Sequence, residues 1–123
     1  SGKSLDLMDQ AKVVKGVKVL ATQVEAENLQ ALRNFGDILR DRIGSGIILL
    51  GSRRGKKVFF VMMVTQDLLS RFNADTMIKR VSKEVKGSGG GRPDMAQAGG
   101  TDVSKLDHAL HSIYKIVEGG GEG

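Results

Sequence analysis

The sequence predicts an α/β domain: a small mixed β-sheet with a β-hairpin, covered by helices on both faces, and a glycine-rich loop before the last helix. Two apolar runs, "IILL" (47–50) and "KVFFVMMV" (57–64), have no polar side. This is typical of strands buried on both faces of a sheet. The short polar connection between them contains Gly55 and favours a hairpin. Amphipathic segments flank these runs, so helices are available to cover both faces.

The first part of the chain is predicted to form two parallel strands joined by a helix. Residues 4–16 have helical spacing and stop at a glycine, so we expect the end of a longer helix there. "VKVLATQV" (17–24) alternates and is β-branched, which predicts a strand. Between 26 and 43, apolar residues recur every three or four positions and predict an amphipathic helix ended by Gly44. A right-handed crossover through it makes strand 17–24 parallel to the next.

The second part is predicted to hold two helices around a glycine-rich segment. Asn73 is a good N-cap for a helix over 73–86 that turns basic side chains to solvent. Within "KGSGGGRPDMAQAGG" (86–100), residues 95–98 suit a short buried edge strand. A last amphipathic helix begins near Thr101 or Asp102. The helices therefore enclose a segment that is half loop and half packed strand.

Length and composition indicate one small domain. The 123 residues contain no Cys, which excludes a disulfide framework and a thiolate zinc site. No apolar run approaches the length of a membrane helix and no signal-peptide pattern is present, so we expect a cytoplasmic chain with no membrane partner. We divide it into the end of an inter-domain linker helix (1–16), a globular domain (17–118) and a disordered tail (119–123).

Charge is distributed unevenly along the chain. Ten basic and three acidic residues lie between Arg53 and Arg92, whereas the rest of the chain carries nine basic and eleven acidic residues. Such asymmetry indicates a polyanionic partner. The alternative is a solvated basic face that binds nothing.

No motif for catalysis or for nucleotide binding is found. The glycine-rich segment lacks the Gly-Lys-Ser/Thr of a P-loop, follows a helix and fails the dinucleotide pattern. His108 and His111 lie one helical turn apart without a third ligand near in sequence, so we expect surface or packing histidines and no metal site. No carboxylate pair or Ser/His/Asp set suggests an enzyme in this chain.

Several segments, in order, carry a family resemblance over about residues 5–118. "LRNFGDILRDRIGSGIILLGS" (32–52), "VTQDLLSRFNADTMIKRV" (64–81) and "GGGRPDMAQAGG" (89–100) closely resemble the end of bacterial-type alanyl-tRNA synthetases. This domain type also follows the catalytic domain of DHH phosphoesterases, but the upstream Asp-His-His constellation of those enzymes is missing here.

The resemblance implies an accessory domain that binds the outer corner of tRNA, where the D and T loops meet. It would help aminoacylation and editing to act on one tRNA, and both reactions belong to upstream domains of an alanine–tRNA ligase. ATP with Mg²⁺, and Zn²⁺ for editing, would belong to those domains, so no cofactor is expected in this fragment. The implied partners are alanine-accepting tRNA and the upstream domains. Two alternatives are self-association as a homodimer and the substrate-binding half of a phosphoesterase.

Candidate RNA-binding residues follow from charge and from backbone accessibility. Lysine and arginine would contact phosphates, and glycines would let backbone N–H groups approach them. Gln97 would either cap the backbone or touch RNA. The candidates are Arg53, Arg54, Lys56, Lys57, Lys79, Lys83, Lys86, Gly89, Gly90, Gly91, Arg92, Gln97, Gly99 and Gly100. Phe72 and Tyr114 are weak candidates for base stacking, because Phe59 and Phe60 are expected to be buried.

Overall fold

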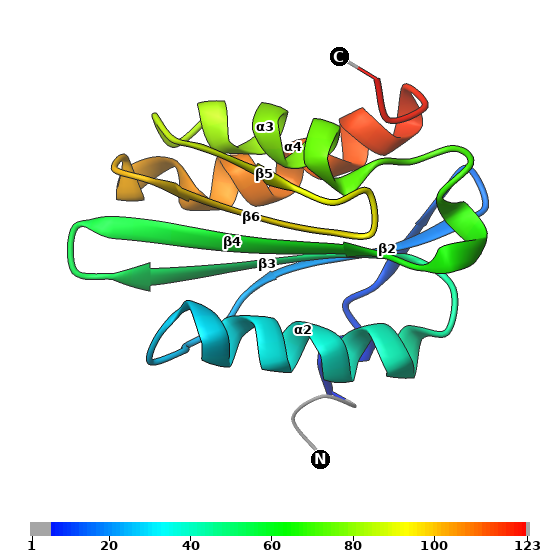
Figure 1. The fold of residues 1–123 in the computed structure, drawn as a ribbon, viewed down its shortest axis with the longest axis horizontal. Coiled ribbons are helices and arrows are strands. Elements are labelled where there is room, and N and C mark those ends of the chain that lie inside the picture. Colours follow the sequence, from blue (N-terminus) through cyan, green and yellow to red (C-terminus); the bar gives the residue numbers. More distant parts are fainter. Residues whose placement is uncertain (1–5, 123) are drawn as a thin grey trace.

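The computed structural model describes residues 6–122 and confirms the predicted α/β class (Figure 1). A six-stranded mixed sheet has the order β1-β2-β3-β4-β6-β5. Its strands are β1 (Lys12–Val14), β2 (Val17–Gln23), β3 (Ile47–Arg54), β4 (Lys57–Val64), β5 (Ser88–Gly91) and β6 (Met95–Gly100). The helices are α2 (Leu29–Ile43), α3 (Ala74–Lys83) and α4 (Leu106–Glu118), with 3-10 turns at Gln66–Leu68 and Val103–Lys105.

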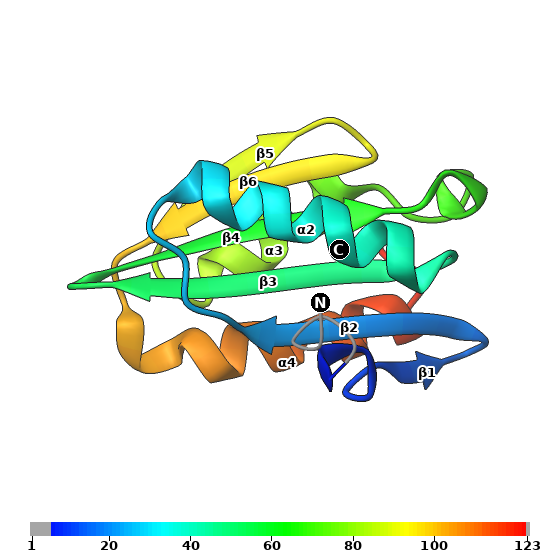
Figure 2. The same ribbon diagram turned by 90° about the horizontal axis from the view of Figure 1, so that it is seen from below.

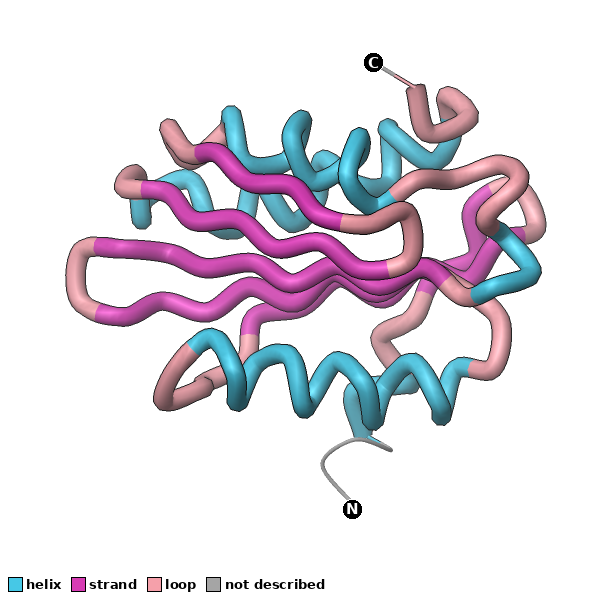
Figure 3. Tube along the Cα trace, viewed as in Figure 1, coloured by secondary structure: helices cyan, strands magenta, loops and turns pink. Residues whose placement is uncertain are grey.

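Helices cover both faces of the sheet, as predicted. α2 lies on one face, and α3 and α4 lie on the other (Figures 1 and 3). Side chains alternate along β3 and β4, so Leu50 and Val61 pack in the α2 core while Leu49 and Phe60 pack in the α3–α4 core. Both sets must be apolar, which explains the uninterrupted runs in the sequence.

The predicted parallel crossover is confirmed. β2 and β3 pair in parallel, with Val19 opposite Ile47, and α2 connects them. Asn28 begins α2, because its side-chain oxygen accepts the amide of Ala31 at 2.8 Å. Gly44 ends the helix at a positive φ of 73°.

The predicted β3–β4 hairpin is confirmed, and its strand pairing extends beyond the apolar residues into the basic ones. Pairing runs from Ile47 opposite Val64 to Arg54 opposite Lys57, which leaves only Gly55 and Lys56 in the turn. Arg53, Arg54 and Lys57 therefore lie on paired strand ends, and only Lys56 lies in the turn.

The prediction of a helix over 4–16 is wrong for its second half. Residues 6–8 form one helical turn, but Lys12–Val14 form β1, which pairs antiparallel with β2. Lys15 and Gly16 make the tight turn between the strands, with φ values of 49° and 81°. Residues 1–5 lie outside the described part, and the assignment of 1–16 to a linker stays a prediction.

The glycine-rich segment is not a loop, and 95–98 is not the edge strand. Ser88–Gly91 form β5 and pair antiparallel with β6, so β6 lies between β4 and β5 (Figure 2). A run of glycines therefore forms the outer edge of the sheet.

The expected disordered tail is placed against the domain over 119–122. The amide of Gly121 donates to the carbonyl of Ile116 at 2.7 Å, and Gly121 lies against the ring of Phe72. Residue 123 is outside the described part. The C-terminal glycines thus extend the last helix as a packed turn.

Candidate nucleic-acid interface

Connections between distant elements meet at one end of the molecule. The β3–β4 turn, the β2–α2 connection, the α3–β5 connection and the β6–α4 connection all lie there, on the left in Figure 1. We call this the basic end, after its exposed cations Arg53, Arg54, Lys56, Lys57, Lys83 and Lys86. The hairpin turn and the end of α3 thus lie at the same end of the molecule.

One cavity joins the hairpin to the glycine-rich segment. It has a volume of about 430 Å³, and Lys57 of β4 and Lys86 after α3 both line it. Phe59, Gly99 and Thr101 contribute to the same wall. We call it the hairpin cavity. It places two flexible ammonium groups beside an aromatic ring and strand backbone.

Lys86 has an unusual backbone conformation. Its φ is 54°, and the next amide, of Gly87, closes the end of α3 by donating to Ser82 at 2.9 Å. This helix-terminating position usually holds glycine or asparagine, since a side chain there costs about 1 kcal/mol. Lys86 thus adopts an unfavourable backbone conformation, and its side chain lines the hairpin cavity.

The ring of Phe59 is half-buried, although the sequence predicted that it would be buried. Phe59 lies opposite Gly99 in the β4–β6 pairing. A Cβ on Gly99 would meet the ring at 3.7 Å, an ordinary contact, so the glycine leaves one part of the ring uncovered. Of the predicted stacking residues, Phe72 is only 3% exposed and cannot stack on a base. Tyr114 is half-buried on α4, away from the glycine-rich segment.

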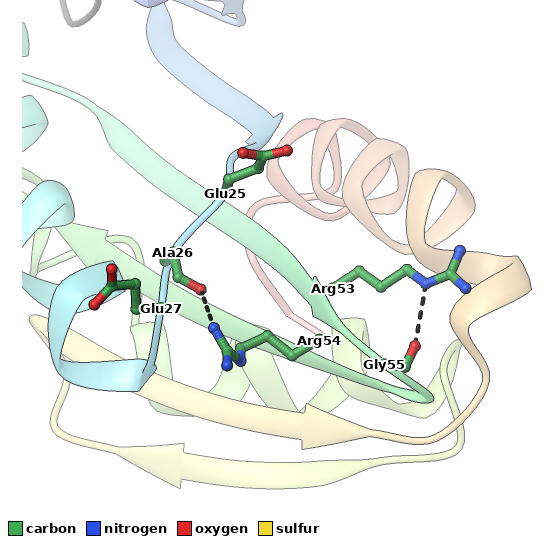
Figure 4. A pocket seen from close by; sticks show the side chains of 6 residues that line it. All are labelled: Glu25, Ala26, Glu27, Arg53, Arg54 and Gly55. Atoms are coloured by element: carbon green, nitrogen blue, oxygen red, sulfur yellow. Dashed lines mark hydrogen bonds between the residues drawn. The ribbon is translucent and has the colours of Figure 1, made fainter.

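Arg53 and Arg54 line a separate cavity of about 760 Å³ (Figure 4). The Arg54 guanidinium donates to the carbonyl of Ala26 at 3.2 Å, and Arg53 Nε donates to that of Gly55 at 3.2 Å. Glu25 and Glu27 also belong to this cavity and offset part of its positive charge. Arg54 therefore holds the β2–α2 connection and Arg53 holds the β3–β4 turn, while both add to the positive electrostatic potential.

Gln97 lines a third, smaller cavity on the α2 side of the sheet. The cavity has a volume of about 220 Å³ and includes Arg33 of α2, Arg92, Gly90 and Gly91. The Gln97 side-chain oxygen is buried without a hydrogen-bond partner among the described residues. An unpaired buried oxygen is unfavourable, so a donor from water or from a ligand is expected there. Gln97 and Gly99 are two residues apart on β6 and so share one face of the sheet. The third cavity and the hairpin cavity therefore lie along the same face of β6.

Most glycines of the segment are required by close packing. A Cβ on Gly89 would lie 2.2 Å from the Gln97 carbonyl oxygen, and one on Gly91 would lie 2.7 Å from that of Met95. On Gly100 it would lie 2.4 Å from the side chain of Val85. Because these glycines have no side chains, β5 and β6 can pack closely against each other and against α3 and the residues that follow it.

Asp75 fastens the glycine strand to α3. Its carboxylate accepts the Gly91 amide at 2.9 Å and the Lys79 ammonium at 3.1 Å. The hydrogen bond from Gly91, followed by that from Lys79, lowers the pKa of Asp75 below its ordinary value. Lys79 is therefore engaged in a structural ion pair, unlike Lys83, which lies at the end of α3.

The predicted residues therefore do not form one site. Lys57, Lys86, Gly99 and Gly100 share the hairpin cavity, whereas Arg53 and Arg54 share the cavity at the β2–α2 connection. A third group, Gly90, Gly91, Arg92 and Gln97, lines the third cavity, whereas Lys56, Lys79, Lys83 and Gly89 line none of the three. Arg33 and Thr101 are among the lining residues that were not candidates, and Thr101 was predicted only as the start of a helix. No local signal identifies either of them, because both reach the cavities through tertiary packing.

Comparison with known proteins defines the class. Residues 16–119 match the model of the DHHA1 domain. The chain therefore belongs to the DHHA1 domain family. The structure is similar to the crystal structure of the C-Ala domain from Aquifex aeolicus alanyl-tRNA synthetase, with a TM-score of 0.82 and 32% identity, covering 88% of this chain and 97% of that one.

Curated relatives agree with that likeness. The chain is 51% identical over 114 residues to an alanine–tRNA ligase of Pelotomaculum thermopropionicum, covering 92% of the chain but only 13% of the relative. The resemblance predicted from the sequence is confirmed. A DHH-domain member of the S1P family of ribosomal proteins shares the fold at 15% identity, with a TM-score of 0.63 over 95% of this chain and 30% of that one.

Residues 6–122 show neither a membrane-spanning helix nor a metal-binding cluster. No helix in this range is both long and apolar enough to cross a membrane. Within the same residues, no group of three or more His, Cys, Asp or Glu side chains is arranged to hold a metal ion.

Proposed function

We propose that this chain is the C-terminal accessory domain of an alanine–tRNA ligase and that its basic end binds the outer corner of tRNA, where the D and T loops meet. The observation that carries the proposal is the hairpin cavity, in which Lys57 and Lys86 flank a partly exposed Phe59. The likeness to the C-Ala domain of an alanyl-tRNA synthetase supports it. In the parent enzyme the domain helps aminoacylation and editing to act on one tRNA.

The geometry suits folded RNA better than a sequence-specific readout. Lys57 and Lys86 bind phosphates, with Lys56 and Lys83 adding to the local field. The exposed part of the Phe59 ring accepts one unstacked base of a loop. The unpaired Gln97 oxygen accepts a hydroxyl or amino group further along the same side of β6. Phosphate contacts set affinity, while the shape of the corner sets selectivity.

The salt dependence of tRNA binding tests this assignment. The variant Lys57→Ala/Lys86→Ala removes two phosphate contacts and should lower the slope of log affinity against log salt by about 1.4, since each contact contributes about 0.7. The matched control is Lys12→Ala/Lys18→Ala, which removes the same charge from β1 and β2 at the far edge of the sheet. The control should keep the original slope.

A second measurement tests which part of tRNA is bound. Changes in the acceptor stem and anticodon should leave affinity unchanged, whereas disrupting the D-loop to T-loop contact should weaken it. Equal affinity for unstructured RNA of the same length would contradict the proposal. An unchanged slope in Lys57→Ala/Lys86→Ala would show that the hairpin cavity is not the site.

Two other readings stay predictions. Self-association through the glycine-rich segment and the last helix can be tested by light scattering with and without tRNA. The hypothesis of a phosphoesterase half requires a neighbouring metal-binding domain. Hydrolysis of a phosphoester by this chain with manganese would support that hypothesis. ATP, Mg²⁺ and Zn²⁺ are proposed for other domains of the parent enzyme.

A further inference from the structure

A groove between α3 and α4 gathers charged and titratable side chains that the proposed RNA site does not use. It lies on the helical face shown at the top of Figure 1 and has a volume of about 440 Å³. Its lining comes from both helices: Arg80, Glu84, His108, His111, Lys115 and Ile116. This volume is within the usual range for sites that hold small organic molecules.

The polar groups of the groove are partly paired, and the pairing leaves specific atoms free for a ligand. Glu84 Oε2 lies 3.1 Å from His108 Nε2. His111 Nδ1 lies 2.9 Å from the carbonyl oxygen of Asp107, which can only accept, so Nδ1 carries the hydrogen. His111 Nε2 is then the nitrogen that can take a second proton. Arg80 donates one bond to the carbonyl of Glu122 and has further N–H groups to offer.

The charge of the lining depends strongly on pH. With neutral histidines, Arg80 and Lys115 against Glu84 give the lining a net charge of +1. Protonation of His108 and His111 raises it to +3, and the protonated His108 also neutralises the adjacent carboxylate. Histidine is the side chain that changes charge between about pH 5 and 8. An anion is therefore attracted far more strongly in acid than in base.

The groove also offers some apolar surface. Ile116 belongs to the lining but is only 4% exposed, so the aliphatic stems of Arg80 and Lys115 must supply most of this surface. Water contact with these stems is lost when an apolar body covers them, which is favourable. The ligand that fits is thus both anionic and partly apolar.

We propose that the α3–α4 groove binds a small organic anion, an apolar or aromatic body carrying a carboxylate or phosphate, when His108 and His111 are protonated. Arg80, Lys115 and His111 contact the anionic group, and Ile116 contacts the body. This site is independent of tRNA binding.

Other charged groups near the histidines also contribute to the electrostatic potential of the groove. Asp107 lies one turn before His111, and Asp9, Lys12 and Tyr114 line the neighbouring cavity, to which His111 also belongs. On the α3 side Lys83 lies next to Glu84 in the chain. These groups include both signs. Of the side-chain types present, only histidine ordinarily changes charge between about pH 5.5 and 8. The pH dependence of binding should therefore follow the two histidines.

Benzoate is the probe for the pH dependence, because it stays ionised from pH 5.5 to 8. Calorimetric titration of the chain should show binding at least about tenfold tighter at pH 5.5 than at pH 8. Acetate, which lacks the apolar body, should bind at least about tenfold more weakly than benzoate. Phenyl phosphate at pH 6.5 identifies the preferred group: tighter binding than benzoate assigns a phosphate, and weaker binding assigns a carboxylate.

Variants at exposed positions separate the groove from general electrostatics. Lys115→Met keeps most of the side-chain volume and should weaken benzoate about tenfold, while Lys105→Met, outside the groove, should leave binding unchanged. His108→Gln/His111→Gln should abolish the pH dependence. Chemical shifts on binding should be confined to amides of α3 and α4. Equal losses in Lys115→Met and Lys105→Met, binding independent of pH, or acetate binding as tight as benzoate would overturn the proposal.

Discussion

Two adjacent antiparallel hairpins in this molecule are held together by opposite means. In β3–β4, eight pairs of mostly large apolar residues fill two cores, and only a two-residue turn lies outside the pairing. In β5–β6, the outer strand consists of one serine and three glycines, and backbone meets backbone at distances that exclude side chains. Side chains specify the first hairpin, whereas the second is specified by their absence and by α3.

The tertiary support of the glycine hairpin is visible in its hydrogen bonds. The amide of Ala74 donates to the carbonyl of Pro93 at 2.8 Å, and Val64 donates to Asp94 at 3.0 Å. At the other end, the amides of Thr101 and Asp102 both donate to the carbonyl of Val85 at 2.9 Å. The hairpin is thus fixed at both ends by α3 and its flanking residues.

The largest expected difference between the hairpins is their response to one added methyl group. Gly89→Ala places a Cβ 2.2 Å from the Gln97 carbonyl oxygen and should lower the free energy of unfolding by about 3 kcal/mol. Gly55→Ala in the β3–β4 turn meets no atom within 4 Å and is opposed only by its φ of 59°, so about 1 kcal/mol is expected. Urea unfolding of both variants measures the contrast. Equal losses would show that β5 has room to move.

A smaller effect is expected from the ion pair that holds β5, and it should depend on pH. The pKa of Asp75 is lowered in the folded chain, chiefly by the hydrogen bond from Gly91, so its contribution is complete above the ordinary aspartate pKa of about 3.9. That contribution is lost as pH falls through the lower folded value.

Asp75→Asn, measured by urea unfolding from pH 7 to pH 2, should therefore be less stable than the parent at neutral pH. The two curves should converge in acid. A constant difference over the whole range would show that the carboxylate charge does not hold the strand.

Lys86→Gly should separate stability from binding. Glycine removes the penalty of the positive φ at the end of α3, so the variant should be more stable by about 1 kcal/mol. It should nevertheless bind tRNA more weakly, because the hairpin cavity loses one cation. Thermal unfolding and filter binding test the two effects. Lys83→Gly, at the last residue of α3, is the comparison in which glycine relieves no positive φ. A variant that binds tRNA as tightly as the parent would remove Lys86 from the interface.

The smallest effect is expected at the one glycine of β6 that has room. Gly99→Ala makes only ordinary contacts of 3.6 Å and longer, and should change stability by less than about 0.5 kcal/mol. Gly100→Ala, its neighbour, meets Val85 at 2.4 Å and should cost several times more. Thermal unfolding of the two variants would show whether close packing is specified residue by residue. Equal losses would contradict this.

The sequence predicted the parts of the fold that side chains specify. The apolar runs located β3 and β4, Asn73 located the start of α3, and the amphipathic repeat located α2. β5 was missed because glycines carry no apolar alternation. β1 was missed because three residues cannot show a strand period, and the preceding helical spacing was extended through them.

The candidate site was predicted less completely, for a related reason. Lys57 and Lys86, which line one cavity, could be named from charge. The contribution of Arg33 depends on the packing of α2 against β3 and β4, which places Arg33 in one cavity with Gln97 and which no local pattern reports. The engagement of Lys79 with Asp75 depends likewise on the position of the glycine strand.

The two ends of the described chain leave from opposite faces of the sheet. Leu7 and Met8 pack in the α2 core, whereas Gly121 packs on Phe72 beside α3, and neither contact lies at the basic end (Figures 1 and 2). A dye or a surface tether attached at residue 6 or 122 would therefore leave the basic end open to a polymer as large as tRNA. A pair of dyes at these two positions would report on the distance across the domain, and so on unfolding, without contacting the RNA.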